Sequence, residues 1–223
     1  AGPAGHRADS GAGPGTLQGE VGRPLVIARA PLRISLAGGG SDLPEYWRQP
    51  GRVGRVVSFA IDSYVWVTLS RRFEPEILVS YREVEEAKGI ENIKHPLVRK
   101  ALKRFDMPEK HIEIHIIANL PGKGTGLGSS SALAVALVEA CHEWQGWTFP
   151  HLSGDRELDL SWQVTAEMAW QLERSENGPK VGIQDHAAAA CGGMNFFEFS
   201  PVHVDSFKYW HRFWRTCTDY CLN

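Results

Sequence analysis

The segment from Leu120 to Ala132 constrains this chain more than any other. Glycine stands at every second position before three consecutive serines, at Gly122, Gly124, Gly126 and Gly128. Glycine lets the backbone approach a ligand closely, and serine is favoured at helix starts, where free N–H groups and the helix dipole attract anions. The segment therefore predicts a phosphate-binding loop at a helix N-terminus, although a serine-capped turn with a purely structural role has the same pattern.

The spacing within this segment excludes two common nucleotide-binding loops. Lys123 follows the first glycine and no lysine precedes a serine or threonine, so the segment is not GxxxxGK[ST]. It does not fit GxGxxG either. The GxSxG elbow of serine hydrolases is also absent, because the run Gly128 to Ala132 lacks the second glycine.

Hydrophobic patterns elsewhere predict a mixed sheet-and-helix protein. Strands are predicted at Leu25 to Ala37 with an interruption at Pro31, Val56 to Phe59, Tyr64 to Leu69, Ile77 to Ser80, Ile112 to Ile116 and Met194 to Phe199. Helices are predicted at Leu97 to Phe105, Ser129 to Trp144, Arg156 to Arg174 and Gln184 to Cys191. Their irregular order favours an α+β fold over a regularly alternating one.

Charge and composition narrow the classes of partner. The chain has 24 basic and 26 acidic residues and no strongly basic run, which argues against nucleic acid or an anionic membrane as partner. Its longest mostly apolar stretch, Ala132 to Cys141, is too short for a membrane span, so we expect a cytoplasmic protein. Residues 1–24 are rich in glycine and predict a disordered leader, whereas residues 206–223 form an atypical aromatic tail. No feature indicates an oligomeric state.

Three segments together resemble the GHMP kinases, the superfamily of galactokinase, homoserine kinase, mevalonate kinase and phosphomevalonate kinase. They are Ala30 to Pro44, Pro121 to Ala132, which is similar to the PxxxGLGSSxA phosphate loop, and Gly182 to Gly193. Over about Leu25 to Pro201 the chain most resembles the D-glycero-D-manno-heptose 7-phosphate kinases. The resemblance implies that residues 25–205 form an α+β GHMP kinase N-terminal, ATP-binding domain, of the ribosomal protein S5 domain 2 type.

The resemblance also implies a reaction, the ATP-dependent phosphorylation of a sugar phosphate at its anomeric hydroxyl. ATP and Mg²⁺ are the implied cofactors, and the implied nucleotide contacts are Pro121, Gly122, Gly124, Gly126, Leu127, Gly128, Ser129, Ser130 and Ser131. The family's third glycine-rich motif has no counterpart after Gly193. We therefore expect the C-terminal domain to be missing and the chain alone to have little activity.

Individual roles follow from matching motif positions. Asp185 matches the general base and Arg33 the arginine that stabilises charge at the reacting hydroxyl. Ser130 and Glu173 match the Mg²⁺ ligands, with Glu176 as an alternative to Glu173. As helix-start, strand-end or surface residues, all of these also have ordinary structural roles.

The resemblance also implies which residues bind the acceptor substrate, and they lie in the turn after the first strand. The residues that match substrate-binding positions are Gly39, Gly40, Ser41 and Asp42. His186 is a departure, since the heptose kinases more often have glutamine there. Two alternatives remain open: an L-fucokinase-like sugar kinase, and a non-catalytic binding or sensor protein with the kinase fold.

Overall fold

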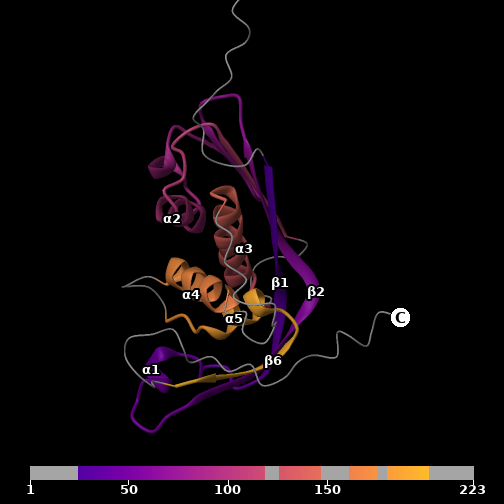
Figure 1. Ribbon diagram of the computed structural model, residues 1–223, viewed down its shortest axis with the longest axis vertical. Helices are drawn as coiled ribbons and strands as arrows, with labels where there is room; N and C mark the ends of the chain where they lie inside the picture. Colours follow the sequence, from indigo (N-terminus) through magenta and orange to yellow (C-terminus); the bar gives the residue numbers. More distant parts are fainter. Residues whose placement is uncertain (1–24, 119–125, 147–160, 175–179, 201–223) are drawn as a thin grey trace, which may run out of the picture.

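The computed structural model describes residues 25–118, 126–146, 161–174 and 180–200 (Figure 1). In chain order its elements are β1 (Leu25–Ala37), α1 (Pro44–Trp47), β2 (Gly54–Arg71), β3 (Ile77–Ser80), β4 (Val84–Ala87), the 3-10 helix η1 (Ile90–Asn92), α2 (Pro96–Arg104), β5 (Ile112–Ala118), α3 (Ser129–Trp144), α4 (Ser161–Glu173), α5 (Gln184–Cys191) and β6 (Met194–Phe199). The strands form one sheet in the order β1-β2-β5-β3-β4, and β6 also pairs with β2. The predicted α+β class is confirmed.

The first strand continues through the predicted interruption. Pro31 lies opposite Tyr64, and the register between β1 and β2 shifts between Pro31 and Arg33. β1 stands at an edge of the sheet, which is where proline, a residue without an N–H group, is tolerated in strands. The prediction of two separate strands between Val56 and Leu69 was wrong, because β1 pairs on both sides of the irregularity and holds them together as one strand, β2.

β2 is shared by two further antiparallel neighbours. Its first part pairs with β6, from Gly54 opposite Phe199 to Phe59 opposite Met194. Its last part pairs with β5, where Val65 lies opposite Ala118. The strand that follows the site residues in sequence, β6, is thereby joined to the beginning of β2.

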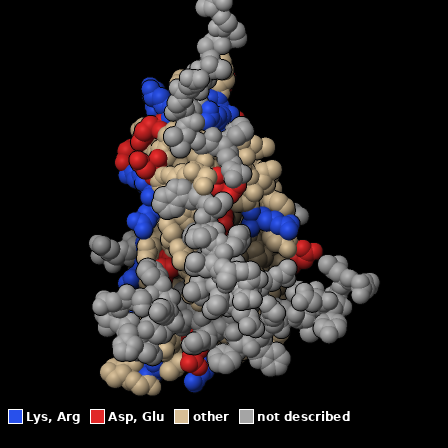
Figure 2. Space-filling model, viewed as in Figure 1, with Lys and Arg blue, Asp and Glu red and all other residues tan. Residues whose placement is uncertain are grey.

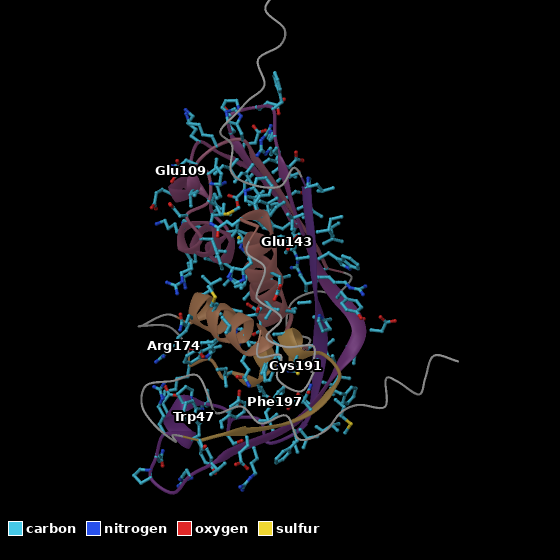
Figure 3. All side chains as sticks on the ribbon, viewed as in Figure 1. Trp47, Glu109, Glu143, Arg174, Cys191 and Phe197 are labelled. Carbon is cyan, nitrogen blue, oxygen red and sulfur yellow. The ribbon has the colours of Figure 1, made fainter. Side chains whose placement is uncertain are left out.

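The helices gather on one side of the sheet, with α3 running along β1 and β2 (Figure 1). α3 is buried on nearly all sides, as its continuous apolar sequence predicts, and it joins the sheet in the main hydrophobic core. A smaller cluster around Phe197 includes Trp170 of α4, Ile183 and Ala187, with Trp47 packed against it. Figure 3 shows Trp47 and Phe197 at the same end of the molecule, below α5. The two clusters fix α4 and α5 relative to the sheet.

α1, β4 and η1 were not among the predicted elements, and some predicted segments fall outside what the structure describes. β4 was missed because one of its two buried positions is occupied by a charged residue, Glu85, rather than by an apolar one. The Glu85 carboxylate accepts hydrogen bonds from the backbone N–H groups of Lys94 and His95. The expected start of the third helix at Arg156 lies outside the described residues, as do the predicted leader and tail.

Charge on the visible face is mixed. In Figure 2, basic and acidic side chains occur beside one another on the described surface. Among the described residues, no helix combines the length and the apolar character that crossing a membrane requires.

Candidate active site

The start of α3 is built to receive an anion. Gly126 and Gly128 have φ angles of 68° and 72°, in the left-handed region that favours glycine. Gly128 is the N-cap of α3, and no side chain that the structure describes caps this helix. The first-turn N–H groups, from Ser129 to Ser131, are therefore available to a ligand at the positive end of the helix dipole.

A cleft of about 490 Å³ lies against this helix start. It is lined by Gly40, Asp42, Leu43, Gly126, Leu127, Gly128, Ser129, Ser130, Ser131, Glu173, Lys180, Val181, Gly182, Gln184 and Asp185. The lining comes from the turn after β1, the glycine loop, the end of α4 and the start of α5. All three motif segments thus meet at one cavity, together with the carboxylate at the end of α4.

Arg33 connects these segments from behind. Its Nε donates to Oδ1 of Asp185 at 2.7 Å, and a terminal nitrogen lies 2.6 Å from the same oxygen. The other terminal nitrogen donates to the carbonyl of Gly126 at 2.5 Å, and the Arg33 backbone N–H donates to the carbonyl of Leu127 at 3.2 Å. One side chain therefore orients Asp185 and also fixes the loop.

Glu173 lies at the end of α4, against the start of α3 and beside α5. Its Oε2 accepts a hydrogen bond from Ser131 Oγ at 2.8 Å and lies 2.7 Å from Nε2 of His186. Burial acts to raise the pKa of Glu173, but the contact with His186 and its charge, and the hydroxyls of Ser130 and Ser131, lower it to about 2. The carboxylate is therefore charged at neutral pH.

The donor set at this corner fits Mg²⁺. Ser130 and Glu173 both line the cleft and offer a hydroxyl and a charged carboxylate, the hard oxygen ligands that Mg²⁺ prefers. Within the described ranges, no group of three or more His, Cys, Asp or Glu side chains forms a closed metal cage. Mg²⁺ itself usually takes one or two carboxylates and completes its coordination with phosphates and water.

Asp42 is almost fully buried, at 3% exposure, and it joins the turn after β1 to the start of α5. Oδ1 accepts from the Gly40 backbone N–H at 2.9 Å and from Nε2 of Gln184 at 3.3 Å, while Oδ2 accepts from the Gln184 backbone N–H at 3.2 Å. A Cβ on Gly182 would lie 1.9 Å from Oδ2, so the approach requires glycine. Burial raises the pKa of Asp42, and the backbone hydrogen bonds from Gln184 and Gly40 oppose part of the rise.

The structure brings most predicted site residues to the cleft, but not all. Ser41 directs its hydroxyl to the carbonyls of Gly38 and Arg55 and does not line the cleft. Gly39 lies behind the lining, where its Cβ would be 3.6 Å from Nε2 of Gln184. The residues outside the described ranges are Pro121, Gly122, Gly124 and Glu176.

Two cleft residues with polar side chains were missed by sequence reasoning. Gln184 accepts a hydrogen bond from Ser35 Oγ at 2.9 Å and donates to Asp42, so it links β1 to the start of α5. Its position immediately before Asp185 was an available signal. Lys180 is the only lysine or arginine among the described lining residues, and a cation next to the third motif was a second signal.

Comparison with known families identifies the domain to which this cleft belongs. Residues 94–193 match the model of the GHMP kinases N terminal domain. The chain contains a GHMP kinase N-terminal domain. The match runs from α2 to α5 and includes the loop of Gly126 and Gly128, Glu173 and Asp185, whereas β1 and Arg33 precede it.

Relatives of this GHMP kinase domain include sugar phosphate and mevalonate kinases. The D-glycero-alpha-D-manno-heptose 7-phosphate kinase of Campylobacter jejuni is 31% identical over 185 residues, which cover 78% of this chain and 50% of that protein. A mevalonate kinase of Archaeoglobus fulgidus is 29% identical over 183 residues, which cover 80% of this chain and 55% of that protein. The chain thus spans about half the length of the curated relatives it matches.

A solved structure agrees with this assignment. The crystal structure of a D-glycero-D-manno-heptose 1-phosphate kinase from Bacteriodes thetaiotaomicron superposes with a TM-score of 0.64 at 27% identity, over 79% of this chain and 56% of that one. The GHMP kinase fold is therefore supported by sequence and by three-dimensional structure.

Proposed function

We propose that this chain is the nucleotide-binding half of an ATP-dependent kinase that phosphorylates the anomeric hydroxyl of a sugar phosphate of the heptose 7-phosphate type. One observation carries the proposal: a single cleft is lined by the glycine loop at the start of α3 and by the carboxylates Asp185 and Glu173. A kinase site needs to position phosphates and an acceptor and to neutralise charge, and it needs little covalent chemistry from the protein. We place the protein in the cytoplasm, where ATP is abundant.

In the proposed reaction the acceptor hydroxyl oxygen attacks the γ-phosphorus, and the bond from that phosphorus to the β,γ-bridging oxygen breaks, which releases ADP. Asp185 accepts the hydroxyl proton, as a carboxylate within reach of the acceptor can. Arg33 keeps Oδ1 of Asp185 oriented and offsets negative charge beside it. The N–H groups from Ser129 to Ser131, at the start of α3, bind the phosphates.

Two further groups complete the proposed site. Mg²⁺, held by Ser130 and Glu173, would neutralise phosphate charge. Lys180 lines the same cleft, and its side chain is 65% exposed and pairs with Glu45 only at 4.0 Å, a weak surface pair that it can exchange for a phosphate of either substrate. On the acceptor side, Gly40 and Asp42 line the wall, and Gly39 and Ser41 shape the turn behind it.

The choice of acceptor rests on the relatives. The Campylobacter jejuni protein is named as a heptose 7-phosphate kinase, and the Bacteriodes thetaiotaomicron structure as a heptose 1-phosphate kinase. The relative from Archaeoglobus fulgidus, named as a mevalonate kinase, is slightly less similar, which makes mevalonate the second candidate acceptor. Both candidate acceptors offer a hydroxyl group to the same phosphoryl transfer.

The experiment measures ADP release in a coupled assay with heptose 7-phosphate, mevalonate and L-fucose in parallel. The chain is assayed by itself and as a fusion to the C-terminal half of the Campylobacter jejuni kinase, because it spans only half of that relative. We expect acceptor-dependent ADP release with heptose 7-phosphate in the fusion, and loss of that release with Asp185→Asn. Nucleotide binding by calorimetry without turnover on any acceptor would favour a non-catalytic binding protein and contradict the proposal.

A further inference from the structure

His186 is a buried polar side chain that the proposed reaction does not use. It follows Asp185 in α5, is 0% exposed, and places Nε2 2.7 Å from Oε2 of Glu173. Neither ring nitrogen has an aligned hydrogen-bond partner among the described residues, so the close approach of Nε2 to Glu173 is a charge contact. A buried polar ring without such partners is costly unless the contact it does make is useful.

The contact closes a small network across three helices. Ser131 of α3 and His186 of α5 approach the same oxygen, Oε2 of Glu173, from α4. The Glu173 side chain is 18% exposed and reaches the cleft, which Ser131 also lines, whereas His186 is fully buried behind it. Two groups on one oxygen fix the rotation of the carboxylate, so that it presents a defined face to the cleft.

We propose that His186 is a positioning residue for the cation, holding the Glu173 carboxylate in the orientation that binds a divalent metal. The inference rests on the proposed function, because it takes Glu173 as a ligand. Groups that hold a metal ligand in place without touching the metal typically change metal affinity about 10- to 100-fold when they are removed. Glutamine also carries an N–H donor, so a glutamine at this position can serve the same purpose.

The test compares two substitutions of similar volume. His186→Leu removes the nitrogen and fills the buried space, whereas His186→Gln keeps a donor. His142→Leu is the matched control, because His142 is also buried, at 2% exposure, but lies in α3 against Phe105 and does not line the cleft. Circular dichroism and thermal unfolding show which variants fold. Ser131→Ala, which removes the hydroxyl that donates to Oε2, provides an independent variant.

Metal binding is read directly rather than through activity. Free Mn²⁺ is measured by EPR spectroscopy in titrations of the chain, first with Mn²⁺ alone and then with Mn²⁺ and a non-hydrolysable ATP analogue. We expect Mn²⁺ to bind about 10- to 100-fold more weakly to His186→Leu, on the scale of lost positioning groups, and about as well to His186→Gln as to the wild type. Ser131→Ala should be weakened in the same direction, and His142→Leu should be unchanged.

Equal or tighter Mn²⁺ binding by a folded His186→Leu would overturn the inference, since a histidine that competes with the metal gives that result. Absence of Mn²⁺ binding in the wild type under both conditions would overturn it too, by removing the metal role of Glu173. A chain that fails the kinase assay but loses Mn²⁺ with His186→Leu would contradict the proposed function alone. The two claims therefore fail separately.

Discussion

Arg33 and Asp185 lie 152 positions apart in sequence, yet Nε of Arg33 donates to Oδ1 of Asp185 at 2.7 Å. The pair joins β1 to the start of α5, and the guanidinium also reaches the carbonyl of Gly126. A rigid planar fork suits such a double role, because it makes several hydrogen bonds in fixed directions. Base, loop and first strand are thereby held as one unit.

Replacing the proposed base should abolish most catalysis without disturbing binding. Asp185→Asn keeps the shape of the side chain and removes the proton acceptor, so we expect kcat to fall by about 10²–10⁴-fold, the usual contribution of a general base. Asp62→Asn, an exposed carboxylate of β2 outside the cleft, is the matched control and should retain activity. A fall of less than about tenfold for Asp185→Asn on this scale would assign the step to other groups.

Arg33→Lys tests whether geometry matters in addition to charge. Lysine keeps the positive charge but has one nitrogen, which cannot reach both Asp185 and the carbonyl of Gly126. Loss of one charged hydrogen bond costs about 1.5–3 kcal/mol, so kcat/KM should fall by roughly 10- to 100-fold. Arg55→Lys is the control, because Arg55 forms an exposed pair with Glu198. Unchanged kinetics for Arg33→Lys would mean that charge alone suffices.

Gly126→Val should weaken nucleotide binding. Gly126 and Gly51 share a positive φ, 68° and 73°, and an added Cβ at either meets nothing within 4 Å, so valine strains the backbone similarly at both. Only Gly126 lines the cleft. Calorimetry with a non-hydrolysable ATP analogue should show a loss of about tenfold or more for Gly126→Val, equal to about 1.4 kcal/mol. Gly51→Val should bind as the wild type does, and equal losses in both variants would contradict the loop assignment.

Asp42 should make stability depend on pH in a defined direction. Because burial raises the pKa of Asp42 in the folded state above 3.8, the folded chain binds this proton more tightly than the unfolded chain does. Its contribution is complete below the unfolded pKa and is lost as pH rises through the folded pKa. The free energy of unfolding of the wild type, measured relative to Asp42→Asn by urea titration, should therefore decrease from about pH 4 to about pH 7. An increase over that range would show that the hydrogen bonds outweigh burial.

The local elements of the fold were predictable where one pattern dominated. α3, α5 and β6 follow directly from a serine start, an alanine run between glycines and an aromatic stretch. β1 and β2 were divided too finely, because local breakers such as Pro31 are overruled by pairing between distant segments. β4 escaped prediction because the burial of Glu85 depends on backbone N–H groups from the following turn.

The site residues also divide into those that local sequence motifs predict and those whose contacts come from distant parts of the chain. The glycine loop and Asp185 were found from motifs, but the ion pair with Arg33 and the network of Asp42 and Gln184 exist only in three dimensions. Asp42 is a clear case, since the sequence suggested a substrate ligand and the structure adds internal partners for both oxygens. A single sequence does not show whether a polar group is buried.

The pairing of β6 with the beginning of β2 sets an order for folding. Gly54 meets Phe199 across the sheet, so this ladder closes a loop of most of the domain, and such non-local contacts form slowly. During synthesis the β1 and β2 hairpin can form while the later helices are still being made. Asp185 can pair with Arg33 only after α5 has left the ribosome. Until then the Arg33 guanidinium lacks its carboxylate partner, and the site is incomplete.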